Sequence, residues 1–244
     1  MTAIQIMSLT KKFRAKTAVD SLSLSIEQGE LFALLGVNGA GKTTTIKMLT
    51  CLSKPTSGDA ALLGDSIVSK AYAVKEKIGV SPQETAIARN LTVRENLAFI
   101  AKIYEFNKNT VEKKVEEMLI AFGLKEVSND KAKTLSGGMQ RRLSIAMALI
   151  SNPQILFLDE PTLGLDVLAR RELWNIIGRL KGKITIILTT HYMEEAEALS
   201  DRIGIMVKGK LKAVGTAAEL MKKKNAKTLE DAFVSIVAKE GAVS

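Results

Sequence analysis

The sequence predicts an α/β protein with a mainly parallel core sheet, an N-terminal antiparallel β-subdomain and an inserted helical subdomain. Apolar runs of strand length alternate with helical patterns, and the links between them are short, as in parallel sheets covered on both faces. The middle third, about residues 83 to 134, changes to helix after helix. The first part of the chain instead contains short strand patterns with period-two alternation, which are typical of antiparallel strands.

Each expected element has a local pattern behind it. Thr92 and Glu95 form a capping box that begins a helix, and Gly123 is placed to end the next one. The expected strands cover residues 4–7, 22–26, 31–35, 78–81, 154–158, 184–188, 202–207 and 211–214, with a small hairpin over 57–67. The expected helices cover about residues 43–52, 92–103, 110–123, 137–151, 167–180 and 193–200.

Length and composition indicate one packed domain. The chain has 244 residues, 46% of them apolar, which is enough for a single core. We expect an α/β core with its β-subdomain over residues 1–82 and 152–220, a helical subdomain over about 83–151 and a C-terminal helical tail over about 221–244. No run approaches the roughly 18 apolar residues of a membrane-spanning helix, and the N-terminus lacks a secretory signal. We therefore expect a cytoplasmic location.

The charge of the chain is strongly basic. The formal net charge is +9, carried by scattered lysines. Such a balance could favour nucleic acid or an anionic membrane. No aromatic side chains are interleaved with the basic ones, so no nucleic acid partner is expected. Glu194, Glu195 and Glu197 have the pattern of a solvated helix face.

Residues 36–43, GVNGAGKT, match the phosphate-loop pattern G-x-x-x-x-G-K-[ST] between a strand and a helix. Glycines let the backbone approach phosphates with its N–H groups, and the helix start attracts anions. Lys42 is expected to bridge the β- and γ-phosphates, and the Thr43 hydroxyl to bind Mg²⁺. The alternative, an ordinary glycine-rich turn, does not account for the full spacing. The expected nucleotide-binding residues of this segment are Gly36, Asn38, Gly39, Ala40, Gly41, Lys42, Thr43 and Thr44.

An apolar strand over residues 155–158 delivers two carboxylates, Asp159 and Glu160, at its C-terminal end. Open α/β sheets place their ligands at this edge. Asp159 is suited to hold Mg²⁺, and Glu160, which points differently, is suited to act as general base on the attacking water. Without the phosphate loop, the alternative would be a strand that ends in a solvated acidic turn.

The segment Leu135-Ser136-Gly137-Gly138-Met139 distinguishes this chain from other phosphate-loop proteins. It resembles the signature LSGGQ of the ABC ATPase family, and it lies in the order that the family uses. The resemblance implies that Ser136, Gly137 and Gly138 of one subunit close over the nucleotide bound by a second subunit, in a two-fold dimer.

The resemblance extends along essentially the whole chain and implies further site residues. Gln83 corresponds to the family's Q-loop glutamine, which contacts Mg²⁺ or water, and His191 to the histidine near the γ-phosphate. Asp166 belongs to a D-loop, here Leu-Gly-Leu-Asp instead of the commoner SALD. Phe13 takes the place of an aromatic that stacks on adenine, with core packing as its alternative.

The expected function is that of the ATP-binding and ATP-hydrolysing subunit of an ABC transporter. ATP and Mg²⁺ are the expected cofactors. The expected partners are a second ATP-binding subunit and integral membrane permease subunits. The expected location is the cytoplasmic face of the membrane. The residue patterns of 191–202 and 229–233 resemble those of the exporter subfamily that serves drugs, antibiotics or sodium. The alternative is a soluble ABC ATPase acting on ribosomes or DNA, although the chain lacks their second domain or long coiled coils. No residue specifies the cargo.

Overall fold

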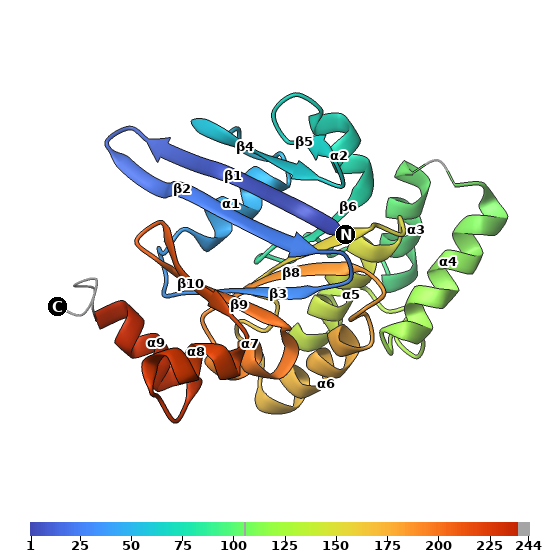
Figure 1. The fold of residues 1–244 in the computed structure, drawn as a ribbon. Coiled ribbons are helices and arrows are strands. Elements are labelled where there is room, and N and C mark those ends of the chain that lie inside the picture. Colours follow the sequence, from blue (N-terminus) through green and yellow to red (C-terminus); the bar gives the residue numbers. More distant parts are fainter. Residues whose placement is uncertain (105, 239–244) are drawn as a thin grey trace.

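The computed structural model describes residues 1–104 and 106–238. These residues form a six-stranded sheet and a four-stranded sheet, with helices around and between them. Figure 1 shows the four-stranded sheet above the core sheet on one side of the molecule, while helices α3 (Val93–Ile103) and α4 (Lys108–Ala121) lie at the opposite side. This arrangement confirms the predicted fold class.

The core sheet has the strand order β10-β9-β3-β8-β7-β6. All its pairings are parallel except that of β10 with β9. Three central strands, β3, β7 and β8, are buried along their whole length, because helices or a second sheet cover both faces. The strands are β3 (Leu31–Leu35), β6 (Ile78–Ser81), β7 (Ile155–Asp159), β8 (Thr185–Thr190), β9 (Arg202–Val207) and β10 (Lys210–Gly215).

The second sheet is antiparallel, with the order β2-β1-β4-β5. Its strands β1 (Thr2–Phe13) and β2 (Lys16–Glu27) pair as a hairpin and are longer than the sequence pattern predicts. The added residues are mostly polar and exposed, so they carry no apolar alternation. β4 (Ser57–Leu62) and β5 (Asp65–Ser66) form the small hairpin that was expected over residues 57–67.

Two separate apolar cores lie on the two faces of the core sheet. β3 shows the division, because Leu31, Ala33 and Leu35 belong to one core while Phe32 and Leu34 belong to the other. The first core includes the helices on the side of α3 and α4. The second joins the antiparallel sheet to α1 (Lys42–Leu49), which lies between the two sheets.

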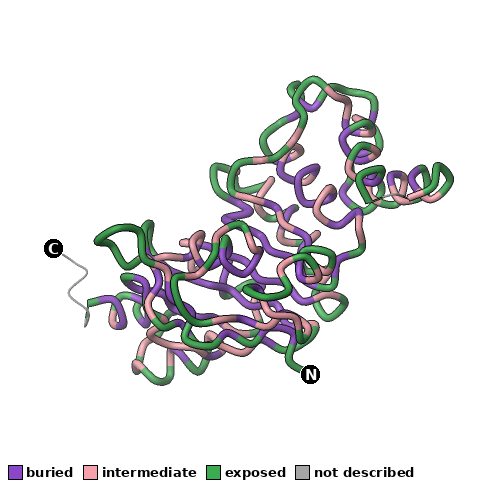
Figure 2. The backbone as a smooth tube through the Cα atoms, turned by 90° about the horizontal axis from the view of Figure 1, so that it is seen from above, coloured by how far each residue is buried: buried purple, intermediate pink, exposed green. Residues whose placement is uncertain are grey.

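The helical subdomain begins with the predicted capping box at Thr92 and Glu95. α4 starts two residues before the predicted position, because the Asn107 side chain accepts a hydrogen bond from Thr110 N and caps it. A short 3₁₀ turn (Ala132–Thr134) then leads into α5 (Gly137–Leu149). Figure 2 shows this part as a lobe that projects from the rest of the chain.

The remaining helices pack along the core sheet. α6 (Val167–Gly178) and α7 (Met193–Leu199) were expected, whereas α2 (Ala71–Lys77) was not. Only Val74 of α2 is buried, so its apolar periodicity is too weak to detect. α8 (Ala217–Lys224) and α9 (Leu229–Ala238) end the described chain, and residues 239–244 of the predicted C-terminal tail lie outside it.

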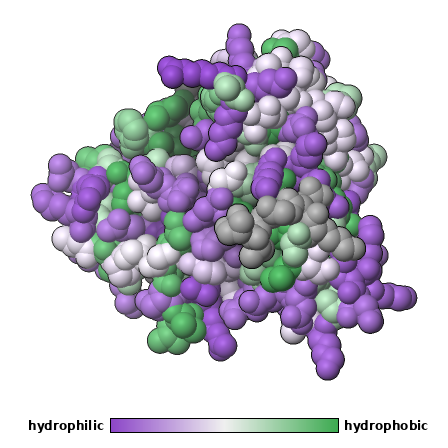
Figure 3. All heavy atoms as spheres, turned by 90° about the vertical axis from the view of Figure 1, so that its left-hand side faces the viewer, coloured by the Kyte–Doolittle hydropathy of each residue, from purple (hydrophilic) through white to green (hydrophobic). Residues whose placement is uncertain are grey.

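Hydrophilic side chains are prominent on the face that carries the C-terminal helices, with only scattered apolar groups between them (Figure 3). This agrees with the many lysines of the sequence. Within residues 1–104 and 106–238, none of the helices has the length and apolar character needed to span a bilayer.

Candidate functional site

The phosphate loop lies between the end of β3 and the start of α1, and its glycines are required by the backbone. A Cβ added to Gly36 would lie 2.5 Å from Met206 O, and one added to Gly41 would lie 2.5 Å from Ala18 O. Gly41 also has φ 107°, in the left-handed region, where it caps α1 without a side-chain hydrogen bond. The first N–H groups of α1 are therefore free to bind an anion.

A cavity of about 510 Å³ opens over this loop. Its walls come from segments far apart in the sequence, because β3, β7 and β8 are parallel and end at the same edge of the sheet. The cavity brings together most of the residues expected to bind and hydrolyse nucleotide. Its lining includes Phe13, Asn38, Gly39, Gly41, Lys42, Thr43, Thr44, Gln83, Glu160 and His191.

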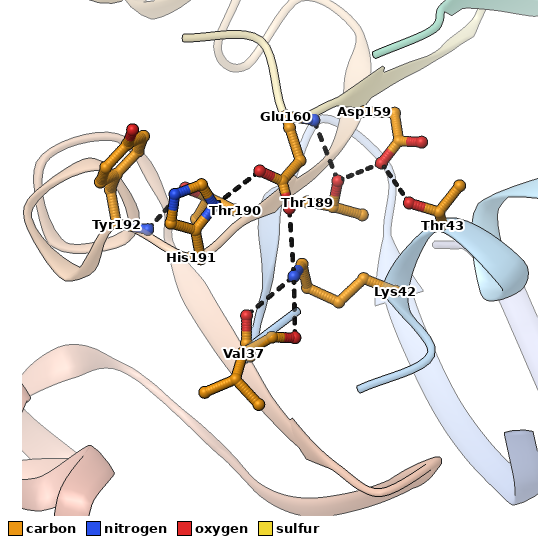
Figure 4. A network of polar contacts seen from close by, with 10 residues as sticks. Val37, Lys42, Thr43, Asp159, Glu160, Thr189, Thr190, His191 and Tyr192 are labelled. Atoms are coloured by element: carbon orange, nitrogen blue, oxygen red, sulfur yellow. Dashed lines mark hydrogen bonds and ion pairs between the residues drawn. The ribbon is translucent and has the colours of Figure 1, made fainter. Parts of the chain in front are cut away.

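A chain of charged contacts crosses the floor of the cavity (Figure 4). Lys42 Nζ donates to Gly36 O at 2.8 Å and forms an ion pair with Glu160 Oε1 at 3.1 Å. The other carboxylate oxygen of Glu160, Oε2, lies 2.6 Å from His191 Nδ1. Both Lys42 and Glu160 are buried, so these contacts are little screened by solvent. A cation, a carboxylate and an imidazole thus share one site.

Glu160 has an unusual backbone. Its φ is 49°, in the left-handed region that a side chain with a Cβ rarely adopts. Its N–H donates to both Thr189 O and Thr189 Oγ1, at 3.1 and 3.0 Å, and these bonds hold the conformation. Such strain costs on the order of 1–3 kcal/mol and is common at functional sites. Here it turns the carboxylate away from the strand direction and toward Lys42 and His191 (Figure 4).

Asp159 lies beside the phosphate loop. Its Oδ1 accepts from Thr43 Oγ1 at 3.1 Å and from Thr189 Oγ1 at 2.5 Å. The described residues contain no cluster of three or more His, Cys, Asp or Glu that could hold a metal ion by themselves. One carboxylate, one hydroxyl and a nearby amide nevertheless suit Mg²⁺, which prefers few protein oxygens together with phosphates and water. The donor set of Asp159, Thr43 and Gln83 therefore fits Mg²⁺.

The loop of Gln83 is held by an arginine that the sequence analysis missed. Arg141 of α5 donates to Pro82 O at 2.7 Å and to Gln83 O at 2.5 Å. Burial lowers the pKa of Arg141, an effect that the carboxylates of Asp159 and Glu195 oppose. The backbone of the glutamine loop is thus fixed to the helix that follows the signature.

The signature residues do not line the cavity of their own chain. Ser136 caps α5 and accepts a hydrogen bond from Met139 N at 3.3 Å. Gly138 packs closely on α6, where an added Cβ would lie 3.0 Å from Ala169 Cβ. Asp166 caps α6 and accepts from Ala169 N at 2.9 Å. These residues therefore form a second group, separate from the cavity.

The structure settles two side chains that the sequence left open or placed wrongly. Phe13 is 52% exposed and lines the cavity, so it is not a core residue. Glu195 was expected on a solvated helix face, yet it is fully buried on α7. Its Oε1 accepts from Trp174 Nε1 at 3.1 Å, a contact between two helices that helical spacing does not reveal.

These features define a phosphate-loop, nucleotide-binding protein. Residues 19–163 match the sequence profile of the ABC transporter family. The chain is 40% identical over 233 residues to the linearmycin resistance ATP-binding protein LnrL of Bacillus subtilis, covering 95% of this chain and 75% of LnrL. It is 42% identical over 227 residues to human phospholipid-transporting ATPase ABCA3, covering 91% of this chain but only 13% of ABCA3.

The fold is similar to that of a solved ATP-binding cassette. The dimeric ATP-binding cassette MJ0796, solved with ADP and Pi, superposes with a TM-score of 0.79 at 26% identity, covering 87% of this chain and 98% of MJ0796. The chain belongs to the ABC transporter family, in which it is an ATP-binding ATPase domain. The resemblance inferred from the signature segment is confirmed.

Proposed function

We propose that this chain is the ATP-hydrolysing subunit of a membrane exporter and works as a head-to-tail pair of subunits. The observation that carries the proposal is the arrangement of Lys42, Glu160 and His191 in the cavity over the phosphate loop. The names of similar proteins, among them an ATP-binding protein for linearmycin resistance and a multidrug transporter component, favour export over the alternative of a soluble ATPase acting on ribosomes or DNA.

ATP is the proposed ligand of the cavity. Residues of the phosphate loop and of the first turn of α1 line it, and Lys42 is placed to bridge the β- and γ-phosphates in exchange for its contacts with Gly36 and Glu160. The exposed ring of Phe13 lies at the cavity wall, where it can stack on adenine. Lys11 Nζ lies 5.0 Å from the centre of that ring.

Glu160 is the proposed general base. Its carboxylate is turned into the cavity and is free to accept a proton from the attacking water once Lys42 moves to the phosphates. His191, which lies 2.6 Å from Glu160, orients that carboxylate and can donate to the γ-phosphate or the water. Mg²⁺, held by Thr43, Asp159 and Gln83, would neutralise phosphate charge when bound.

A second subunit completes the proposed site. Ser136, Gly137 and Gly138 start a helix with unsatisfied N–H groups, which suits a phosphate, but they lie outside their own cavity. In a two-fold pair the signature segment of each chain can close over the nucleotide of the other chain. Asp166 lies next to the signature segment, at the proposed interface between the two chains. The dimeric form of MJ0796 supports this arrangement.

The proposed contact with a membrane permease lies at a groove of about 400 Å³ between the core and the helical lobe. Apolar side chains such as Leu52, Ile100 and Tyr104 line it, together with Pro82, which precedes Gln83. A permease helix in this groove would touch both the lobe and the glutamine loop, so it could sense nucleotide. The subunit would then lie on the cytoplasmic face of the membrane.

Hydrolysis and association test the proposal separately. Glu160→Gln should retain ATP, lose about a hundredfold or more of the turnover and accumulate as dimers, because the general base is removed. Normal turnover in that variant would refute the role of Glu160. The tagged chain, purified gently from detergent-solubilised cells, should carry a multi-span membrane protein in near-stoichiometric amount. Ribosomes or DNA-bound proteins in its place would overturn the transport function and leave the ATPase chemistry intact.

A further inference from the structure

A buried carboxyl group lies behind the Glu160–His191 pair. The side chain of Glu195 on α7 is 0% exposed. Its Oε1 accepts a hydrogen bond from the indole N–H of Trp174 on α6. It does not line the nucleotide cavity. Burying a carboxyl group costs free energy unless the group is hydrogen-bonded, so an apolar side chain at this position would destabilise the fold less than Glu195 does.

Unsatisfied polar atoms gather around this carboxyl. Of the four buried side-chain polar atoms without a hydrogen bond in the described part of the chain, three belong to Glu195, Thr162 and Arg170. Thr162 is fully buried, and its hydroxyl and the hydroxyl of Thr190 both face Glu195. Buried orphan groups are rare, and a cluster of them is a place where hydrogen bonds can be exchanged.

The neighbours of Glu195 are the segments that carry the proposed catalytic pair. Thr162 lies two residues after Glu160, in a turn closed by the hydrogen bond from Leu163 N to Glu160 O at 3.2 Å. Thr190 directly precedes His191. One carboxyl therefore faces both backbone segments whose side chains, Glu160 and His191, meet at 2.6 Å.

A second contact links the same cluster to His191. The guanidinium of Arg170 lies 4.5 Å from the centre of the Tyr192 ring, and that ring lies 4.1 Å from the His191 ring. Arg170 also attracts the carboxyl of Glu195. Since Arg170 N bonds to Asp166 O, the first turn of α6, the Tyr192 ring and the Glu195 carboxyl form one continuous packed unit.

We propose that Glu195 is a positioning residue for ATP hydrolysis, which holds the turn after Glu160 and the residues before His191 in place through its hydrogen bond with Trp174 and its packing against Thr162 and Thr190. The proposal rests on the roles proposed above for Glu160 and His191. Because the phosphate loop is built by β3 and α1, Glu195 affects the rate of the chemical step and leaves nucleotide binding unchanged. A small misplacement of catalytic groups can cost up to about a hundredfold in rate.

Three variants of the full chain test this. Glu195→Met fills a similar volume but removes the hydrogen bond to Trp174, so it should lower kcat about tenfold or more, with KM for ATP and the affinity for a fluorescent ATP analogue nearly unchanged. Glu195→Gln keeps an acceptor for Trp174 and presents a polar amide to the threonine hydroxyls, so it should retain most of kcat. Glu194→Gln, an exposed neighbour on the same helix, is the matched control.

The only tryptophan of the chain provides a readout inside the cluster, because Trp174 is bonded to Glu195. Its emission should change in Glu195→Met and remain close to that of the unaltered chain in Glu195→Gln. Wild-type kcat in Glu195→Met, equal losses in the Met and Gln variants, or a joint fall of kcat, nucleotide affinity and thermal stability would overturn the proposal.

Two further variants keep the proposal testable if Glu195→Met does not fold and separate its failure from a failure of the proposed function. Trp174→Phe removes the indole N–H that bonds to Glu195 and should show the same fall of kcat at unchanged KM, so it replaces Glu195→Met if that chain does not fold. Wild-type kinetics of Trp174→Phe would then overturn the proposal. Glu160→Gln is measured in parallel: an inactive Glu160→Gln beside an active Glu195→Met refutes the inference alone, whereas an active Glu160→Gln refutes the proposed chemistry.

Discussion

Replacing Arg141 by lysine should loosen the glutamine loop without removing a charge. The guanidinium makes two hydrogen bonds to backbone carbonyls, 2.7 Å to Pro82 O and 2.5 Å to Gln83 O. A lysine can reach only one of them in good geometry, because its ammonium is a single point and lacks the planar fork. The bond that is lost involves a charged donor in a buried place and is worth about 1.5–3 kcal/mol.

Urea unfolding measures this loss, and the Arg141→Lys chain should be less stable than the unaltered one by about that amount. Arg171→Lys on α6, which changes an exposed arginine in the same way, should shift the free energy of unfolding by about half a kcal/mol or less. Because Gln83 is a proposed Mg²⁺ ligand, Arg141→Lys should also raise the Mg²⁺ concentration needed for half-maximal ATPase activity. Unaltered stability together with unaltered Mg²⁺ dependence would refute the idea that Arg141 holds this loop.

Three further predictions concern the phosphate loop, the acidic strand end and the buried carboxyl. Gly41→Ala should bind ATP poorly in a filter or fluorescence assay, because its φ of 107° and the 2.5 Å approach of a Cβ to Ala18 O force the loop to move; tight binding would refute the need for glycine. Thr189→Val removes a donor to Asp159 and should lower the free energy of unfolding in urea by about 1–3 kcal/mol, whereas an unchanged midpoint would show that the hydroxyl contributes nothing. Burial raises the pKa of Glu195 above its ordinary value of 4.5, so its stabilising contribution is complete below that pH and is lost as the pH rises through the folded pKa. Glu195→Gln should therefore gain stability relative to the unaltered chain as the pH rises above 4.5, and a difference independent of pH in urea titrations would contradict the raised pKa.

The sequence was informative wherever a local pattern carries the information. The phosphate loop, the capping box at Thr92 and the strand that ends in Asp159 each depend on neighbouring residues and on hydrophobic periodicity, and each is found at its expected place. The parallel order of the core strands brought Lys42, Glu160 and His191 into one cavity, as the resemblance implied.

The parts that could not be predicted depend on tertiary contacts. Arg141 stands in a helix where its spacing suggests nothing about the carbonyl of Gln83, since the two are separated by 58 residues. Two other glutamates lie close to Glu195 in the sequence, so the pattern predicts that all three share a solvated helix face. In the structure, the Glu195 side chain instead points inward and bonds to Trp174. α2 escaped notice because it buries a single apolar side chain, Val74. The division of the chain into the predicted subdomain boundaries stays a prediction.

The core sheet separates two apolar cores that share only its strands, and this has a consequence for how the chain opens. The lobe that carries the signature is continuous with the core on one face, whereas the antiparallel sheet and α1 belong to the other. Thermal opening of one face need not expose the other, since the β3 backbone stays paired with β8 and β9 on either side. Amide hydrogen exchange should accordingly resolve two cooperative units, with the backbone of β3, β7 and β8 exchanging last of all because it belongs to both.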